Sequence, residues 1–254
     1  MKKHILDMRL MANVQLHSAY ALMKFVPVEG ELPAMLPGQF AEVRIDDSAT
    51  TYLRRPISIH NVVNNELWLL VRRAGAGTDK LASLAEGAVV NMVLPLGNTF
   101  TMPTDKNMRP LLIGGGVGVA PLLYWGKELA KQGIRPAFLL GARSDKDLLQ
   151  LPEFEAVGDV YLSTEDGSAG EKGFVTQHSV LNESFSYIYT CGPKPMMQAV
   201  ARIARAHNIA CEVSLENLMA CGVGACLCCV EDTVEGHVCV CKEGPIFNID
   251  RLKW

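Results

Sequence analysis

Six of the eight cysteines in this chain of 254 residues lie between Cys221 and Cys241, and they constrain the fold more than any other feature. Four of them are packed into the stretch CGVGACLCCV. The N-terminal stretch has no signal-peptide core, because Asp7 and Arg9 interrupt it, so we expect a cytosolic protein. In the cytosol, clustered cysteines indicate metal or redox chemistry rather than disulfides. The sulfur therefore serves one local site.

The spacing of these cysteines indicates which metal group they hold. Cys221, Cys226 and Cys229 follow the pattern C-x4-C-x2-C, and Cys241 comes after eleven further residues. This is the ligand pattern of a plant-type 2Fe–2S cluster. Zinc is the main rival, but a structural zinc site usually shows two close pairs of ligands, whereas here only one end is dense.

Four other residues of the cysteine stretch have expected roles. Gly222 and Gly224 let the loop curl so that its amide N–H groups can face the sulfurs. Cys228 and Cys239 are surplus to the four ligands. Each could compete with a neighbouring ligand, but we interpret both as small residues beside the site.

Hydrophobic patterning divides the chain into three parts. Residues 1–105 contain short β-rich runs such as QFAEVRI, PISIHNV and LWLLVRR, which favour an antiparallel barrel or sandwich. Residues 106–210 alternate buried strands with helical stretches, which indicates a doubly wound parallel sheet. Residues 211–254 carry the cysteines and have too little apolar material to fold without their metal. The expected fold class is therefore a β-barrel, then an α/β domain, then a small cluster domain.

Two turns of the expected sheet could bind a nucleotide. The first strand ends in GGGVGVAP, where Gly115, Gly116 and Gly118 would let the backbone approach a phosphate and turn into a helix. The alternative is a tight structural turn, because the strict GxGxxG spacing is absent. The last strand ends in the turn of Cys191, Gly192 and Pro193, at the edge where ligands bind such sheets. Taken alone, Cys191 reads as a small buried residue, and nothing around it in the sequence suggests nucleophilic catalysis.

Two segments of the expected barrel could bind a pyrophosphate. The run RRPISIH places Arg55 and Ser58 on a strand, and the run RRAGAGTDKL offers Gly75, Gly77 and Thr78 in a loop. A fixed positive charge with free backbone donors suits a phosphate pair. For Arg54 and Arg55, a solvated strand edge is an equally good interpretation.

Charge and hydropathy exclude two classes of partner. The net charge of −3 and the lack of a basic run give no case for nucleic acid. The longest uncharged apolar run, residues 111–126, is too short for a membrane span and is broken by glycines and a proline.

Together, the motifs RPIS, GGGVGVAP, CGP and C-x4-C-x2-C resemble the ferredoxin reductase family. Within it, the chain is most similar to the electron-transfer subunits of NAD-dependent dihydroorotate dehydrogenases, on the further evidence of SLENLMACGVGAC and CKEGPIF. This resemblance covers essentially the whole chain. It implies FAD in the barrel, NAD in the second domain and a 2Fe–2S cluster in the tail, with no catalytic acid or base.

The resemblance also implies roles for individual residues. The flavin would be held by Arg55, Pro56, Ile57, Ser58, Gly75, Gly77 and Thr78. Ile57 stands where the wider family has a tyrosine, so a flat ring against the flavin is lost. The nicotinamide nucleotide would be lined by Gly115, Gly116, Gly118, Cys191, Gly192 and Pro193. Iron would be bound by Cys221, Cys226, Cys229 and Cys241.

The implied activity is electron transfer in pyrimidine biosynthesis. Nicotinamide exchanges electrons in pairs and the cluster exchanges them singly, so a flavin is expected between them. An FMN-containing catalytic subunit would supply the pyrimidine site, and we expect a heterotetramer with two copies of each chain. The alternatives are a reductase for a ferredoxin, hydrogenase or oxygenase, and a zinc-stapled redox-sensing or binding module. Arg143 would favour NADP and Asp145 would favour NAD, so the residues alone leave this choice open. The resemblance implies NAD.

Overall fold

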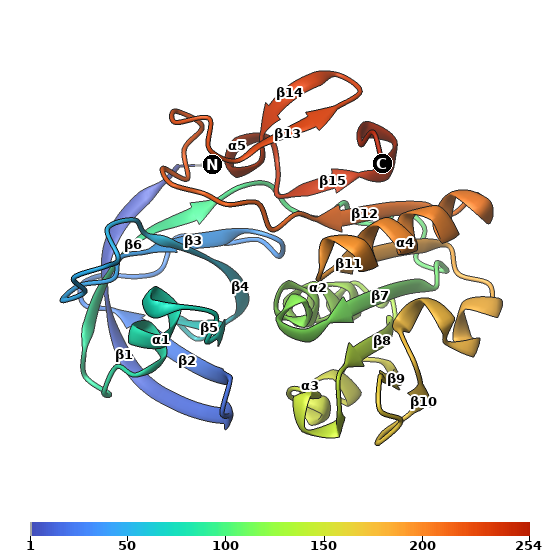
Figure 1. Ribbon diagram of the computed structural model, residues 1–254, viewed down its shortest axis with the longest axis horizontal. Coiled ribbons are helices and arrows are strands. Elements are labelled where there is room, and N and C mark those ends of the chain that lie inside the picture. Colours follow the sequence, from blue (N-terminus) through green and yellow to red (C-terminus); the bar gives the residue numbers. More distant parts are fainter. Residues whose placement is uncertain (1) are drawn as a thin grey trace. The chain divides into compact units, whose positions relative to one another are not determined.

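The computed structural model describes residues 2–254, and they form two compact units (Figure 1). The barrel unit contains the residues up to Thr99, together with Asn217–Glu231 and His237–Pro245. The sheet unit contains Phe100–Glu216, Asp232–Gly236 and Ile246–Trp254. The cysteine-rich part of the tail therefore folds with the barrel, and the last nine residues fold with the sheet.

Six antiparallel strands close the barrel in the order β1-β2-β5-β4-β3-β6, drawn in blue to blue-green in Figure 1. Their bounds are β1 His4–His17, β2 Tyr20–Pro27, β3 Phe40–Val43, β4 Arg55–Val63, β5 Glu66–Arg72 and β6 Val89–Leu96. One short helix, α1 (Ala76–Ala82), follows β5.

The local sequence accounts for the β4–β5 hairpin in this barrel. Val63 pairs with Glu66, so Asn64 and Asn65 form a two-residue turn, and both have positive φ, at 49° and 67°. A type I′ turn requires this conformation at both central residues, and asparagine tolerates it well. The turn sets the register of β4 against β5 from Asn61 to Val63, whereas the other end of β4, which carries Arg55, pairs with β3.

The sheet unit is built on seven strands in the order β10-β9-β8-β7-β11-β12-β15. All neighbours are parallel except β15, which runs antiparallel to β12. The strand bounds are β7 Pro110–Gly115, β8 Ala137–Ala142, β9 Asp159–Thr164, β10 Glu171–Lys172, β11 Tyr187–Cys191, β12 Ala210–Ser214 and β15 Ile246–Asn248. The helices are α2 Ala120–Lys131, α3 Leu151–Glu155 and α4 Lys194–Ala206, with 3-10 turns η1 Gly116–Val119, η2 Asp145–Asp147, η3 Val175–Gln177, η4 Ser179–Asn182 and η5 Ile249–Arg251.

The central strands of this sheet are almost continuously apolar. β7 reads PLLIGG and β8 reads AFLLGA, and most of their residues are buried. Strands covered on both faces need apolar side chains at every position, which explains the missing alternation. The parallel strands and connecting helices expected from the sequence are present, and the predicted fold class is confirmed.

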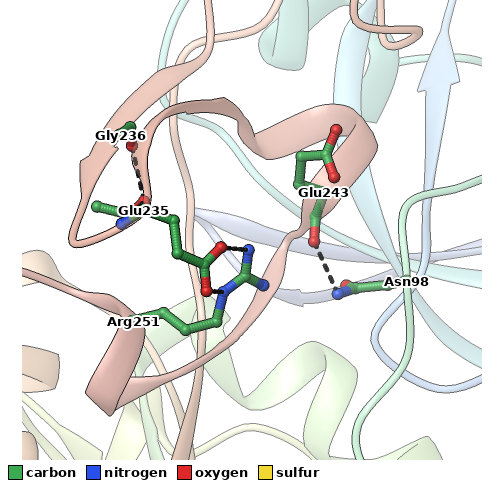
Figure 2. A network of polar contacts seen from close by, with 6 residues as sticks. Asn98, Glu235, Gly236, Glu243 and Arg251 are labelled. Carbon is green, nitrogen blue, oxygen red and sulfur yellow. Dashed lines mark hydrogen bonds and ion pairs between the residues drawn. The ribbon is translucent and has the colours of Figure 1, made fainter.

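The tail adds a two-stranded sheet, β13 (Val230–Thr233) with β14 (Gly236–Cys239), and a short helix, α5 (Val240–Glu243). In the barrel unit, Asn98 donates from Nδ2 to the carbonyl of Glu243 at 3.0 Å, which fixes the end of α5 (Figure 2). In the sheet unit, Arg251 donates from two nitrogens to the carboxylate of Glu235 at 3.0 and 2.8 Å. The division into domains at 105 and 210 stays a prediction.

Within residues 2–254, no helix has both the length and the apolar character needed to cross a bilayer.

Candidate functional site

Backbone amides of the cysteine loop, residues 221–229, point at the cysteine sulfurs. The N–H groups of Val223 and Ala225 donate to Cys221 Sγ at 3.4 and 3.3 Å. The N–H of Gly224 donates to Cys241 Sγ at 3.1 Å, and the left-handed backbone of Gly224, at φ +84°, makes this possible. Such donors stabilise thiolates, and they tune the potential of a cluster bound to them.

The four predicted ligands form two neighbouring pairs. The pKa of the Cys221 thiol is lowered to about 6. The hydrogen bond from the Val223 amide contributes most, and hydrogen bonds from Cys226 add to it. The N–H of Cys241 donates to Cys229 Sγ at 3.4 Å, and their side chains also interact. Burial is the main reason that the pKa of the Cys241 thiol is raised to about 12.

This pairing fits a cluster of two irons, because each iron takes two protein thiolates in addition to the bridging sulfides. Among residues 2–254, no group of three or more His, Cys, Asp or Glu side chains is arranged around a position for a single metal ion. Two thiol pairs linked by one loop, with amide donors on the sulfurs, suit the 2Fe–2S group that the spacing predicts.

The two surplus cysteines, Cys228 and Cys239, differ in their burial. Cys239 is half-buried and interacts electrostatically with Cys229, Cys221 and Cys226, so it faces the same group of thiols. Cys228 is exposed. Their interpretation as residues beside the site stays a prediction.

The structure brings the predicted pyrophosphate residues together at one end of the barrel. Arg55, the first residue of β4, lies against the first turn of α1, where a Cβ added at Gly77 would stand 2.6 Å from Arg55 Nε. Thr78 accepts from the N–H of Ala74 at 2.9 Å and donates to the carbonyl of Gly75 at 3.1 Å. Around Gly75, an added Cβ would meet no atom within 4 Å. This exposed backbone beside a guanidinium fits a phosphate pair.

Arg54 is a structural residue rather than part of a solvated edge. It is half-buried, and its guanidinium donates to the Asn91 carbonyl at 2.8 Å, the Asn91 side chain at 2.6 Å and the Glu42 carbonyl at 3.3 Å. It therefore ties β4 to β6 and β3. The pattern RR alone gives no signal that separates this role from that of Arg55.

The other predicted flavin residues follow Arg55 along β4. Pro56 pairs with Glu42 on β3, Ile57 with Ala41, and Ser58 with Phe40. All three β4 residues are half-buried, so each keeps some surface open beside the Arg55 end of the strand.

In the sheet unit, the two glycine-containing turns pack on each other at the carboxyl ends of β7 and β11. A Cβ at Gly118 would stand 2.4 Å from the carbonyl oxygen of Cys191, so only glycine fits there. A Cβ at Gly115 would stand 3.3 Å from Pro193, and one at Gly192 would stand 3.2 Å from the backbone of Gly115. Gly116 begins η1 with φ +56°. These six predicted residues thus meet where the two turns pack together. Pro193 is exposed and Gly115 and Gly116 are half-buried, so these three remain accessible to a nucleotide, whereas Gly118, Cys191 and Gly192 are buried behind them.

Cys191, behind these turns, carries a thiol that burial keeps protonated. Its side chain is buried, and burial raises its pKa well above the ordinary value. Its Sγ donates to the carboxylate of Glu216 at 3.8 Å. A thiol held protonated is no nucleophile, in agreement with the sequence interpretation.

Sequence reasoning missed two carboxyl groups. Glu216 follows β12, the parallel neighbour of β11, and its place after a strand's carboxyl end was an available signal. Glu42 lies inside the β-rich run QFAEVRI, and it is fully buried although it is the one acidic residue of that run. Nothing in the sequence distinguishes it from a solvent-facing residue.

Two family models match the chain. The iron–sulfur cluster binding domain of dihydroorotate dehydrogenase B matches residues 216–253, and the oxidoreductase NAD-binding domain matches residues 112–202. Among characterised relatives, the dihydroorotate dehydrogenase B (NAD(+)) electron transfer subunit of Shouchella clausii is 40% identical, covering 89% of this chain and 90% of that protein. The subunit of the same name from Caldanaerobacter subterraneus subsp. tengcongensis is 38% identical, covering 94% of each.

Solved structures agree on the fold. A structure of the NADH-dependent reduced ferredoxin-NADP oxidoreductase superposes with a TM-score of 0.86 at 26% identity, covering 97% of this chain and 90% of that one. The ferredoxin reductase of carbazole 1,9a-dioxygenase gives 0.70 at 20% identity, covering 82% and 67%.

A flavin-type barrel, an NAD-binding sheet and an iron–sulfur domain in one chain define an oxidoreductase of the ferredoxin reductase class. More narrowly, the chain belongs to the family of the electron transfer subunits of dihydroorotate dehydrogenase B (NAD(+)).

Proposed function

We propose that this chain passes electrons between an FMN-containing dihydroorotate dehydrogenase catalytic subunit and NAD, and that it does so with a 2Fe–2S cluster and FAD. The single observation that carries the proposal is the cysteine loop with its two thiol pairs and its amide donors, built on a flavin-type barrel. When bound, the cluster supplies one-electron transfer, FAD converts between single electrons and pairs, and NAD accepts a hydride.

The residues of this chain bind and orient these groups. Arg55 supplies a fixed charge and Gly75, Gly77 and Thr78 supply backbone and hydroxyl groups to the FAD pyrophosphate, while Pro56, Ile57 and Ser58 lie along the flavin. Gly115, Gly116, Gly118, Cys191, Gly192 and Pro193 line the NAD. Cys221, Cys226, Cys229 and Cys241 hold the cluster. Close and fixed placement of the groups is the protein's contribution, and no acid–base residue is needed.

The pyrimidine site belongs to the partner. Oxidation of dihydroorotate releases two electrons and two protons, and the sequence of this chain is accounted for by the three parts 1–105, 106–210 and 211–254. We place the assembly in the cytoplasm, as a heterotetramer with two copies of each chain.

One observation favours a different electron-transfer partner for this chain. The 26% identical structural relative is a reduced ferredoxin-NADP oxidoreductase, so a ferredoxin is the alternative partner for the cysteine loop of this chain.

The proposal is tested by co-expression with a catalytic subunit of the dihydroorotate dehydrogenase B type. Purification on a tag carried by this chain should recover both chains, and flavin released by heat should contain FAD and FMN together. Iron and acid-labile sulfide should follow this chain. Recovery of this chain alone, or zinc in place of iron, would contradict the proposal, and binding of a ferredoxin instead would favour the second candidate.

A further inference from the structure

Glu42 on β3 carries a buried carboxyl group to which the proposed function gives no role. Its side chain has no exposed surface, and no hydrogen-bond donor within residues 2–254 reaches either of its carboxylate oxygens. A buried carboxyl without donors is unfavourable for folding, because the hydrogen bonds that it makes with water in the unfolded chain are not replaced. Glutamine or methionine would fill the same space without a charge, so the carboxyl itself is the feature to explain.

The cysteine loop covers Glu42 directly. A Cβ added at Gly222 would stand 2.7 Å from Glu42 Cγ, 3.2 Å from its Oε1 and 2.9 Å from Leu96 Cδ1. Gly222 has φ +65° and follows Cys221, and the charges of Glu42 and Cys221 interact. The carboxyl group therefore lies under the loop that begins with the first cluster ligand.

The same residue also borders the flavin strand. The β3–β4 register pairs Glu42 with Pro56 and Phe40 with Ser58, so these four side chains share one face of the barrel wall. Burial raises the pKa of Glu42, and the positive charges of Arg54, which is fixed by its hydrogen bonds to Asn91, and of Arg55 oppose this by favouring the charged form. Glu42 thus lies next to the cysteine loop, which would hold the cluster, and next to β4, which would hold the flavin.

A charge in this place acts on the cluster through space. A 2Fe–2S cluster with four thiolates is already negative, and reduction adds one electron without any bond being made or broken. A carboxylate that no donor compensates, in a region closed to water, disfavours that extra negative charge.

We propose that Glu42 sets the reduction potential of the cluster. Its carboxylate lowers this potential, so that an electron on the cluster passes on to the flavin. This inference rests on the proposed function, since it requires the cluster on Cys221, Cys226, Cys229 and Cys241. The inference gives a residue of the barrel wall a role in electron transfer, in addition to the roles of the four cysteine ligands.

The test is a redox titration of the cluster in the complete flavoprotein, followed by electron paramagnetic resonance. The variants are Glu42→Gln and Glu42→Met, which remove the charge at similar volume, and Glu42→Asp, which keeps it. Glu66→Gln is the matched control, because Glu66 is a half-buried carboxylate of the same unit that accepts from Trp68 Nε1 at 2.5 Å. The titration is run at alkaline pH, since burial raises the pKa of Glu42 to about 7 and the group must be ionised.

Both neutral variants should hold the cluster with a potential more positive than that of the wild type. Glu42→Asp should stay nearer to the wild type, and Glu66→Gln should not change the potential. The inference is overturned if either neutral variant keeps the wild-type potential, or if Glu42→Asp shifts as far as Glu42→Gln. It is also overturned if only Glu42→Asp assembles the cluster, because the residue then acts in assembly. A wild-type protein without a cluster signal would instead contradict the proposed function.

Discussion

At the scale of single residues, serine substitutions test the ligand assignment. Cys221→Ser, Cys226→Ser, Cys229→Ser and Cys241→Ser should each bleach or destabilise the cluster, because a hydroxyl group is a poorer iron ligand than a thiolate. Cys228→Ser and Cys239→Ser should leave the visible and electron paramagnetic resonance spectra unchanged. The sharpest comparison is between Cys239 and Cys241: an intact cluster in Cys241→Ser together with a lost one in Cys239→Ser would reverse the assignment of the fourth ligand.

For single residues, the sequence indicates ligand types well and their surroundings poorly. The spacing of Cys221, Cys226 and Cys229 was enough to predict a cluster site, because spacing along the chain limits which sulfurs can share one loop. It could not show that Glu42 lies buried beneath that loop, because a β-strand position says nothing about which later segment will cover it. Arg54 and Arg55 are neighbours of identical type, and only their three-dimensional contacts separate them.

The two arginines give a second comparison. Arg55→Ala should weaken FAD binding strongly, since a charge-assisted bond to phosphate is worth roughly 1.5–3 kcal/mol, or about ten- to a hundredfold in affinity. Arg54→Ala should mainly lower the free energy of unfolding, because it removes the hydrogen bonds to Asn91 and to the Glu42 carbonyl. Flavin titration and chemical denaturation measure the two effects. Equal loss of flavin affinity in both variants would show that Arg55 has no special contact.

At the scale of elements, the alternation of strands and helices after residue 106 was readable because buried parallel strands are apolar throughout. The short strands β10 and β15 were not predicted, since two or three residues carry no period. The long-range pairing of β12 with β15 was also not readable from the sequence, since residues far apart in the chain carry no local signal of pairing.

The close packing of the β7 and β11 turns leads to a prediction for one glycine. Gly118→Ala places a Cβ 2.4 Å from the Cys191 carbonyl, so the turns must separate and NAD binding should be lost while FAD is retained. The measurement is the rate of flavin reduction as a function of NADH concentration. Gly133→Ala is the control in the same unit: an alanine at its φ of +81° costs about 1–2 kcal/mol of stability, but nothing lies within 4 Å of the new Cβ. Normal NADH dependence in Gly118→Ala would remove this turn from the NAD site.

At the scale of the whole molecule, the chain combines a nucleotide domain for electron pairs with a cluster loop for single electrons. This combination implies a division of labour. The isolated protein should oxidise NADH with an artificial dye as acceptor and should not convert dihydroorotate to orotate. A steady-state assay of the purified chain checks both statements, and dihydroorotate turnover by this chain alone would contradict the second.

The most direct test of the central claim is NAD reduction driven by dihydroorotate in a complex with the proposed FMN-containing catalytic subunit. Our account predicts that the wild-type complex forms NADH and orotate in equal amounts. It predicts that a complex containing a cluster-free Cys226→Ser chain, with FAD still bound, loses this activity but keeps NADH oxidation by a dye. Full dihydroorotate-driven NAD reduction in the cluster-free complex would show that the electrons do not pass through the cysteine loop, and would contradict the account.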